Sequence, residues 1–199
     1  MMTRRRMLMS SKKKEVFPEG FVPVEYLESA RDVRMDTGII PSIDMSFCAD
    51  FAVVSSENKT SVVFDSDYSW ATGECVYLQV HGIWKWVRAQ FSDATASTGG
   101  NVITNAKTNA AVNANGMFIN GERICILSPS KTLSGYSSSI IIFRTSGMRL
   151  YGFECENDGG IVMDLVPGRI GQVGYMYDRV TGRMFGGSSG DFILGNDVK

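Results

Sequence analysis

The stretch that decides the fold is residues 43–53, which read Ile-Asp-Met-Ser-Phe-Cys-Ala-Asp-Phe-Ala-Val. Apolar side chains stand at every second position, and polar or small side chains fill the gaps. A β-strand sends alternate side chains to opposite faces, whereas a helix would scatter this set around its circumference. The stretch therefore predicts a half-buried strand with these residues on its inner face: Ile43, Met45, Phe47, Ala49, Phe51 and Val53.

Shorter segments on both sides have the same strand character. We expect further strands at residues 24–27, 35–40, 61–65, 75–80, 83–91, 117–119, 122–127, 139–144, 148–155 and 161–165. His81-Gly82 and Asn120-Gly121 predict two-residue hairpin connections, and residues 157–160 predict a hairpin tip. Residues 92–115 are rich in Ser, Thr, Asn, Ala and Gly and predict a loop. About ten to twelve short strands with no sustained helical period favour a sandwich or barrel.

Composition places the chain among soluble globular proteins. The 199 residues are 44% hydrophobic and 21% charged, which suits one all-β domain with a substantial core. We assign residues 1–20 to an extended N-terminal arm and residues 21–199 to the domain.

The arm is strongly basic and the domain is acidic. Six of the 20 basic side chains precede the first acid, Glu15, so the rest of the chain has 14 basic and 21 acidic side chains. Such an arm can anchor the domain to a partner or can be a solvated tail. It lacks interleaved aromatic residues, so we expect no specific nucleic-acid partner. The candidate anchor residues are Arg4, Arg5, Arg6, Lys12, Lys13 and Lys14.

Membrane and export signals are not expected in this sequence. Only residues 7–9 separate the two basic clusters, which is too short for the apolar core of a signal peptide. No run approaches the roughly 18 apolar residues of a membrane span. We therefore expect a soluble protein that is made in a cytoplasm.

Candidate catalytic and metal-binding groups are few. Glu154, Glu156 and Asp158 alternate and could share one strand face, and glycosidases use a pair of carboxylates. The glucanase spacing E-x-D-x-x-E is absent, however, and the three acids approach a predicted hairpin tip, which favours solvated acids. The single histidine, His81, lies in a predicted turn without a Ser or Cys motif. The cysteines have no C-x-x-C spacing and are expected to be buried structural thiols: Cys48, Cys75, Cys125 and Cys155. Calcium is a candidate cofactor, against solvated surface acids, through the oxygens of Asp44, Asp50, Asp65 and Asp67.

A carbohydrate site is a further candidate on the strand predicted at residues 83–91. Trp84, Trp86 and Arg88 share one face, and exposed Trp rings beside a cation can stack on sugars. The alternative is that this face packs into the core. Lys85 on the opposite face favours that alternative, because it makes its own face the wetter one.

Two segments resemble a known family. The first contains Val24-Glu25-Tyr26-Leu27-Glu28-Ser29 and Met35-Asp36-Thr37-Gly38-Ile39. The second contains Met163-Asp164-Leu165-Val166-Pro167, then Gly174-Tyr175-Met176-Tyr177-Asp178, Thr181-Gly182-Arg183-Met184-Phe185-Gly186 and Gly190-Asp191-Phe192-Ile193-Leu194-Gly195. They resemble the concanavalin A-like, laminin-G-like jelly-roll domains of gut bacteriophage structural proteins and of surface proteins of their Bacteroidetes hosts. Residues 30–34 depart from the family pattern, so the first hairpin can differ locally.

The resemblance implies an all-β, antiparallel β-sandwich of the concanavalin A-like lectin and glucanase type. It implies a non-enzymatic virion component, such as a head fibre, decoration protein or appendage, that is made in the bacterial cytoplasm. Its basic arm would bind other virion proteins, and such proteins are usually homo-oligomers, often trimers. The alternatives are a carbohydrate-binding or adhesion module for host surface glycans and a glycan hydrolase on the same fold.

Overall fold

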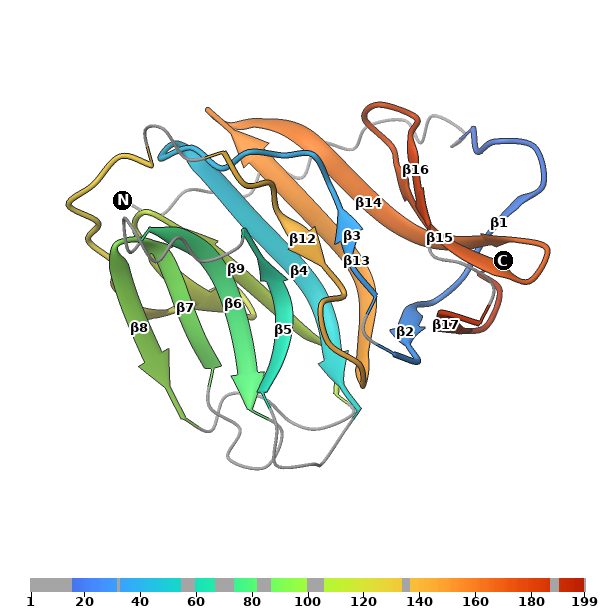
Figure 1. Cartoon of the computed structure of the whole chain (residues 1–199), viewed down its shortest axis with the longest axis horizontal. Helices are drawn as coiled ribbons and strands as arrows, with labels where there is room; N and C mark the ends of the chain where they lie inside the picture. Colours follow the sequence, from blue (N-terminus) through green and yellow to red (C-terminus); the bar gives the residue numbers. More distant parts are fainter. Residues whose placement is uncertain are drawn as a thin grey trace.

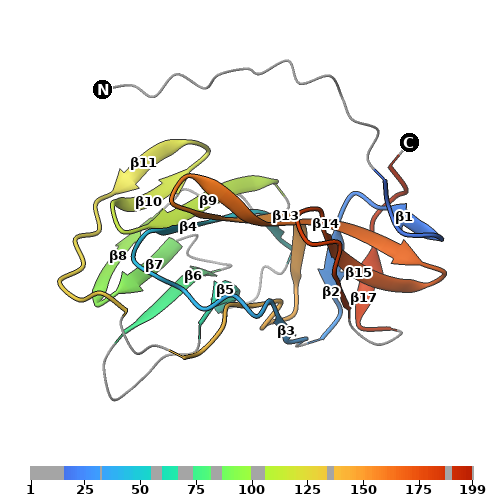
Figure 2. The ribbon, with the colours of Figure 1, turned by 90° about the horizontal axis from the view of Figure 1, so that it is seen from above.

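We describe a computed structural model of the chain. It describes residues 16–31, 33–54, 60–66, 74–81, 87–99, 106–133, 137–186 and 190–198. These residues form two layers of antiparallel strands, which Figure 2 shows edge-on. The expected all-β sandwich is confirmed. No helix in the described ranges is long and apolar enough to cross a membrane.

The larger sheet forms one layer, and its main path runs β11-β10-β9-β4-β13-β14-β15-β16. Strands β1, β2 and β17 join this sheet beside β13 and β14. Its members are β1 (Phe21–Pro23), β2 (Leu27–Ser29), β4 (Met45–Val53), β9 (Thr108–Asn113), β10 (Gly116–Ile119), β11 (Glu122–Cys125), β13 (Met148–Asn157), β14 (Gly160–Ile170), β15 (Val173–Asp178), β16 (Met184–Gly186) and β17 (Phe192–Leu194).

The smaller sheet forms the second layer in the order β3-β12-β5-β6-β7-β8 (Figure 1). Its members are β3 (Met35–Asp36), β5 (Thr60–Asp65), β6 (Cys75–His81), β7 (Val87–Ser92), β8 (Ala94–Thr98) and β12 (Ile141–Ile142).

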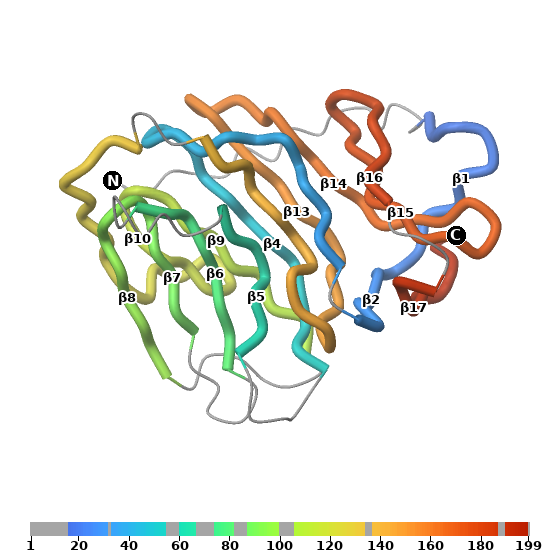
Figure 3. The backbone as a smooth tube through the Cα atoms, viewed as in Figure 1, coloured from blue at the N-terminus to red at the C-terminus, as the bar shows by residue number. Residues whose placement is uncertain are grey.

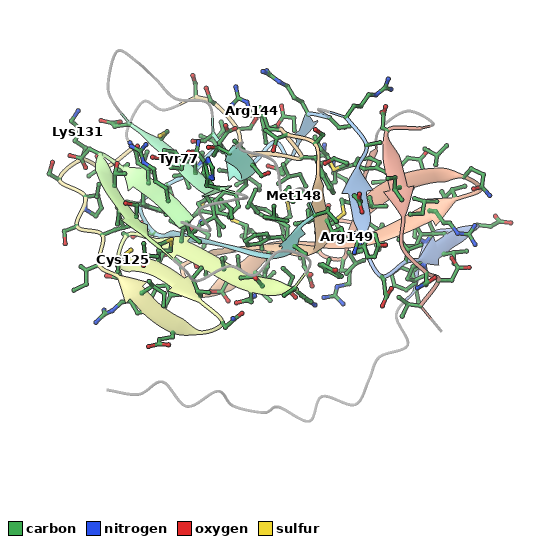
Figure 4. The ribbon with its side chains drawn as sticks, turned by 90° about the horizontal axis from the view of Figure 1, so that it is seen from below. Tyr77, Cys125, Lys131, Arg144, Met148 and Arg149 are labelled. Atoms are coloured by element: carbon green, nitrogen blue, oxygen red, sulfur yellow. The ribbon has the colours of Figure 1, made fainter. Side chains whose placement is uncertain are left out.

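The core lies between the two sheets and is rich in phenylalanine. Phe47 and Phe51 of β4 are fully buried, as the alternation in residues 43–53 predicts. The Phe47 ring lies 6.0 Å from Phe64 of β5 and 6.4 Å from Phe91 of β7, so three strands from both layers meet there. Figure 4 shows Met148 between the layers and the next residue, Arg149, on the outer side of the larger sheet.

The two ends of the described chain close the sandwich together. Strand β1 pairs with β14, and β2 pairs with both β13 and β17 (Figure 3). Asp191 before β17 is paired with Arg31, which follows β2. This pairing covers strand edges that would otherwise be open to aggregation.

Several expected boundaries are wrong. The segment expected as a strand at 24–27 instead joins two short strands, β1, which ends at Pro23, and β2, which begins at Leu27. Within it, Val24 forms an isolated bridge with Asp197. The strands expected at 35–40 and 139–144 shrink to β3 and β12. Residues 92–115 are not all loop, because they contain β8 and β9. Small residues have weak strand propensity, but β9 is flanked by β4 and β10 and buries Ala110 and Val112.

The hairpin predictions have different outcomes. Asn120 and Gly121 both have positive φ, 51° and 83°, and they join β10 to β11 as predicted. Asp158 and Gly159 do the same between β13 and β14. The two-residue connection at His81-Gly82 is wrong. His81 still belongs to strand β6, and Val80 pairs with Val87, whereas a two-residue turn at 81–82 would pair Val80 with residue 83.

Candidate functional site

A polar hollow of about 320 Å³ lies on the outer face of the larger sheet. Its floor is formed by strands β4, β9, β13 and β14, and the turn after β15 closes one side. We call it the groove. The polar side chains that line it are Cys48, Asp50, Asn109, Tyr151, Glu154, Asp164 and Arg179.

Strand alternation brings these distant residues to one face. Phe47, Ala49 and Phe51 face the core, so Cys48 and Asp50 between them must face outward. Antiparallel register then sets the neighbours: Asp50 pairs with Asn109, and Glu154 lies between Cys48 and Asp164. The groove is therefore built from residues that are up to about 130 positions apart in the chain.

The Asp50 carboxylate is held by two donors from β9 and the residues before it. Lys107 Nζ lies 2.9 Å from Asp50 Oδ2, and Asn109 Nδ2 donates a 2.7 Å hydrogen bond to Asp50 Oδ1. The same amide nitrogen lies 3.1 Å from Cys48 Sγ. Burial raises the pKa of the Cys48 thiol, so Cys48 contributes a neutral group to the groove.

The Asp164 carboxylate is held by Arg179 through two nitrogens. Arg179 Nε lies 2.8 Å and Nη2 lies 2.6 Å from Asp164 Oδ2. The turn that carries Arg179 is built on the fully buried Asp178, which accepts hydrogen bonds from the amides of Asp164 and Val180. Asp178 also accepts a hydrogen bond from the Thr181 hydroxyl, so the turn is tied to the sheet.

Glu154 is the remaining acid in the groove. Within the described residues, no hydrogen bond or ion pair reaches its carboxylate. Burial raises the pKa of Glu154, and the negative charges of Asp164 and Glu156 raise it further, whereas Arg179 opposes the shift. Among the groove carboxylates in the described residues, Glu154 is thus the one that no protein donor neutralises.

An aromatic strip continues from the groove toward the β2 side of the sheet. The Lys107 ammonium lies 5.1 Å from the centroid of the Tyr151 ring. The Tyr26 ring meets Tyr151 edge-on at 5.5 Å and has the Arg149 guanidinium 4.5 Å from its centroid. Arg149 Nε in turn donates a 2.8 Å hydrogen bond to Glu28 Oε2. Tyrosine rings provide flat apolar surface with a polar end, which suits carbohydrate.

Of the three residues predicted to bind carbohydrate, only Arg88 lies within the described residues. Trp84 and Trp86 lie outside the described residues. Arg88 is exposed on the outer face of the smaller sheet, between the buried Val87 and Ala89. The expectation that its face packs into the core is therefore wrong at Arg88, because Val87 on the opposite face is the buried one.

Arg88 borders a second hollow of about 530 Å³, which includes Thr95, Ser97 and Thr98 of β8. Its guanidinium lies 5.8 Å from the centroid of the Tyr77 ring, and Figure 4 shows Tyr77 on the layer opposite Arg149. Arg88 and the groove are thus on different sheets.

The other candidate residues are scattered. Glu154 lines the groove, but Glu156 is exposed and Asp158 sits in the turn between β13 and β14. Asp65 pairs with Arg144, Asp50 pairs with Lys107, and Asp67 lies outside the described residues. No three metal-binding side chains gather in the part of the chain that the structure describes, so calcium stays a prediction. All four cysteines are free thiols, and the prediction of burial is confirmed for Cys75 and Cys155 but is wrong for Cys48 and Cys125, which are half-buried.

The arm residues lie outside the described ranges. The anchor set Arg4, Arg5, Arg6, Lys12, Lys13 and Lys14 therefore stays a prediction, as does the division at residue 20.

Sequence reasoning missed Asn109, Tyr151, Asp164 and Arg179 as site residues. The strand pattern gives a clear outward position only for Asp50, between the buried Ala49 and Phe51, whereas Thr108 beside Asn109 is polar and Gly152 beside Tyr151 lies at a register irregularity. What was missing was the order of the strands, which decides that these positions are neighbours.

Comparisons with known proteins give a likeness of fold. No protein-family model and no curated protein matches the chain. Among solved structures it is similar to the Ruminococcus gnavus IT-sialidase CBM40 bound to α2,3-sialyllactose, with 14% identity and a TM-score of 0.46 over 64% of this chain and 89% of that one. A second structure of the Ruminococcus gnavus IT-sialidase CBM40 gives a TM-score of 0.45 at the same identity and coverage. The likeness concerns the sandwich fold alone.

Proposed function

We propose that this protein is a non-enzymatic glycan-binding module whose site is the groove. The observation that carries the proposal is the convergence of carboxylate, amide and guanidinium groups from four neighbouring strands in a hollow of about 320 Å³. Small-ligand sites begin at about this volume.

The lining matches the chemistry of a sugar. Sugar hydroxyls both donate and accept hydrogen bonds, and the groove offers acceptors in Asp50, Glu154 and Asp164 and donors in Asn109 and Arg179. Tyr151 adds a ring against which the apolar C–H face of a sugar can pack. Lys107 and Asn109 already hold the carboxylate of Asp50 in place, and Arg179 holds that of Asp164. This preorganisation lowers the entropic cost of ordering the site on binding.

Hydrolysis is the second candidate function, and one observation favours it. Glu154 has a raised pKa and lies in register with Asp164, and glycosidases use two carboxyl groups on either side of the scissile bond. We favour binding because Glu156, the expected partner, is exposed and outside the groove lining. Release of reducing ends from a bound oligosaccharide would decide for hydrolysis.

A virion role is a further proposal that rests on the sequence resemblance. The groove is compatible with it, since a displayed module can recognise host surface glycans. Deleting residues 1–15 tests the anchor: the truncated protein should fold but should no longer join particles. Full incorporation of the truncated protein would contradict the anchor, and light scattering of the intact protein would test the expected homo-oligomer.

Glycan binding is tested with a glycan array followed by calorimetric titration of the best ligand. Asn109→Ala removes a donor from the groove and frees Asp50, so we expect roughly tenfold weaker binding, or about 1.4 kcal/mol. Tyr151→Ala should weaken binding by a similar factor. Arg88→Ala on the other sheet is the matched control and should bind like wild type. Loss of binding in Arg88→Ala alone would move the site to the smaller sheet.

A further inference from the structure

The charge balance of the groove is uneven. Three carboxylates, those of Asp50, Glu154 and Asp164, line it. Two cations among the described residues form salt bridges with these carboxylates: Lys107 with Asp50 at 2.9 Å and Arg179 with Asp164 at 2.6 Å. A ligand therefore meets one carboxylate, Glu154, that is unpaired within the described residues.

The position of Glu154 makes it the centre of the groove. Its strand β13 lies between β4 and β14, so Glu154 has Cys48 across one strand gap and Asp164 across the other. The carboxylates of Asp164 and Asp50 contribute negative potential at Glu154, and so does Glu156 on the same strand. A positive group on a ligand would relieve this repulsion, and a negative group would add to it.

We infer that the groove selects glycans that present a protonated amine, as in amino sugars, and discriminates against acidic glycans. This inference rests on the proposed function and adds the ligand class. The amine would occupy the space beside Glu154, while hydroxyls on the same ring reach the oxygens of Asp50 and Asp164. Tyr151, which already carries the Lys107 ammonium 5.1 Å from its ring centroid, lines the same hollow.

An acidic sugar would have to share the cations of the existing ion pairs. Its carboxylate could bind Lys107 or Arg179 only beside Asp50 or Asp164, whose positions are fixed by the register of the sheet. It would then lie close to two carboxylates, that of the ion pair and that of Glu154. This repulsion is the physical basis of the discrimination.

The test compares three tetrasaccharide probes on the full chain by calorimetric titration. The probes are a tetramer of glucosamine, the same tetramer fully N-acetylated, and a tetramer of galacturonic acid, at a pH below the pKa of the sugar amine. The first two share a backbone and differ in charge. We expect wild type to bind the amine form roughly tenfold more tightly than the acetylated form, and to bind the acidic form least.

Two variants locate the effect. Glu154→Gln keeps the shape and should bring the amine and acetylated forms to within about twofold of each other. Glu122→Gln, at an exposed position on β11 outside the groove, should keep the wild-type preference.

The outcomes separate the two proposals. Equal binding of the amine and acetylated forms by wild type, or tightest binding of the acidic form, overturns the inference and leaves glycan binding intact. A preference that survives in Glu154→Gln also overturns it. Binding of none of these probes, together with a blank glycan array, overturns the proposed function itself.

Discussion

Glu154 on β13 lies directly across from Asp164 on β14, and Arg179 from the next turn pairs with that aspartate. Two carboxylates at adjacent sheet positions repel each other, and the guanidinium offsets the repulsion. Burial makes the largest contribution to the raised pKa of Glu154, and on top of it Asp164 raises this pKa while Arg179 lowers it. This balance can be tested from both sides.

Removing each partner should shift the pKa of Glu154 in opposite directions. Asp164→Asn removes a negative neighbour and should lower the pKa of Glu154, whereas Arg179→Gln removes a positive neighbour and should raise it. A carboxyl-detected NMR titration of the side chain measures both shifts. Shifts of the same sign in the two variants would contradict the described pairing.

Glu154 should make the protein less stable as pH rises. Its pKa is raised in the folded state, so the folded protein holds this proton more tightly than the unfolded chain does. Stability from this group is therefore present at low pH and is lost as pH rises from the ordinary glutamate pKa through the folded-state pKa. Glu154→Gln should then be more stable than wild type at neutral pH, by about 0.5 kcal/mol given its partial exposure.

Urea unfolding at an acidic and a neutral pH checks this expectation. Glu122→Gln, at an exposed position on β11, is the control and should leave the free energy of unfolding unchanged within error. A Glu154→Gln protein that is less stable than wild type at neutral pH would show that the carboxylate has a stabilising partner.

The contact between Phe21 and Gly168 should show strong coupling. A Cβ atom built on Gly168 would lie 2.0 Å from the tip of the Phe21 ring, so β1 packs on β14 only because position 168 has no side chain. Gly168→Ala should cost roughly 1–3 kcal/mol of stability through overpacking. The cost should shrink when Phe21 is also replaced by alanine, and a double-mutant cycle measures the difference. Additive effects would mean that the ring moves aside freely.

The buried cysteines should resist alkylation in the folded protein. Burial raises the pKa of both Cys75 and Cys155 to about 12, so almost no thiolate is present near neutral pH. Mass spectrometry after brief iodoacetamide treatment should find both residues unmodified, and both should react once urea unfolds the chain. Rapid labelling of either in the native protein would contradict its burial.

The fold was largely predictable and the site was not. The alternation in residues 43–53 predicted the inner face of β4, and the Asn120-Gly121 pair predicted the hairpin between β10 and β11, because both signals are local. Strand β9 was missed because its small residues carry little propensity, and its place is decided by β4 and β10 on either side. Glu154 was noticed only for its spacing to Glu156 and Asp158, although its cross-strand neighbour in the groove is Asp164.

By itself, the sequence determined that the chain is rich in antiparallel strands and that its basic charge is concentrated before Glu15, because side-chain alternation, turn residues and charge are properties of neighbouring positions. Only the tertiary structure decided that Asp50, Asn109, Glu154 and Asp164 share one groove and that Arg88 lies on the other sheet. The reason is physical: a strand's own pattern determines which side chains face outward, but its neighbours are chosen by the packing of the whole core.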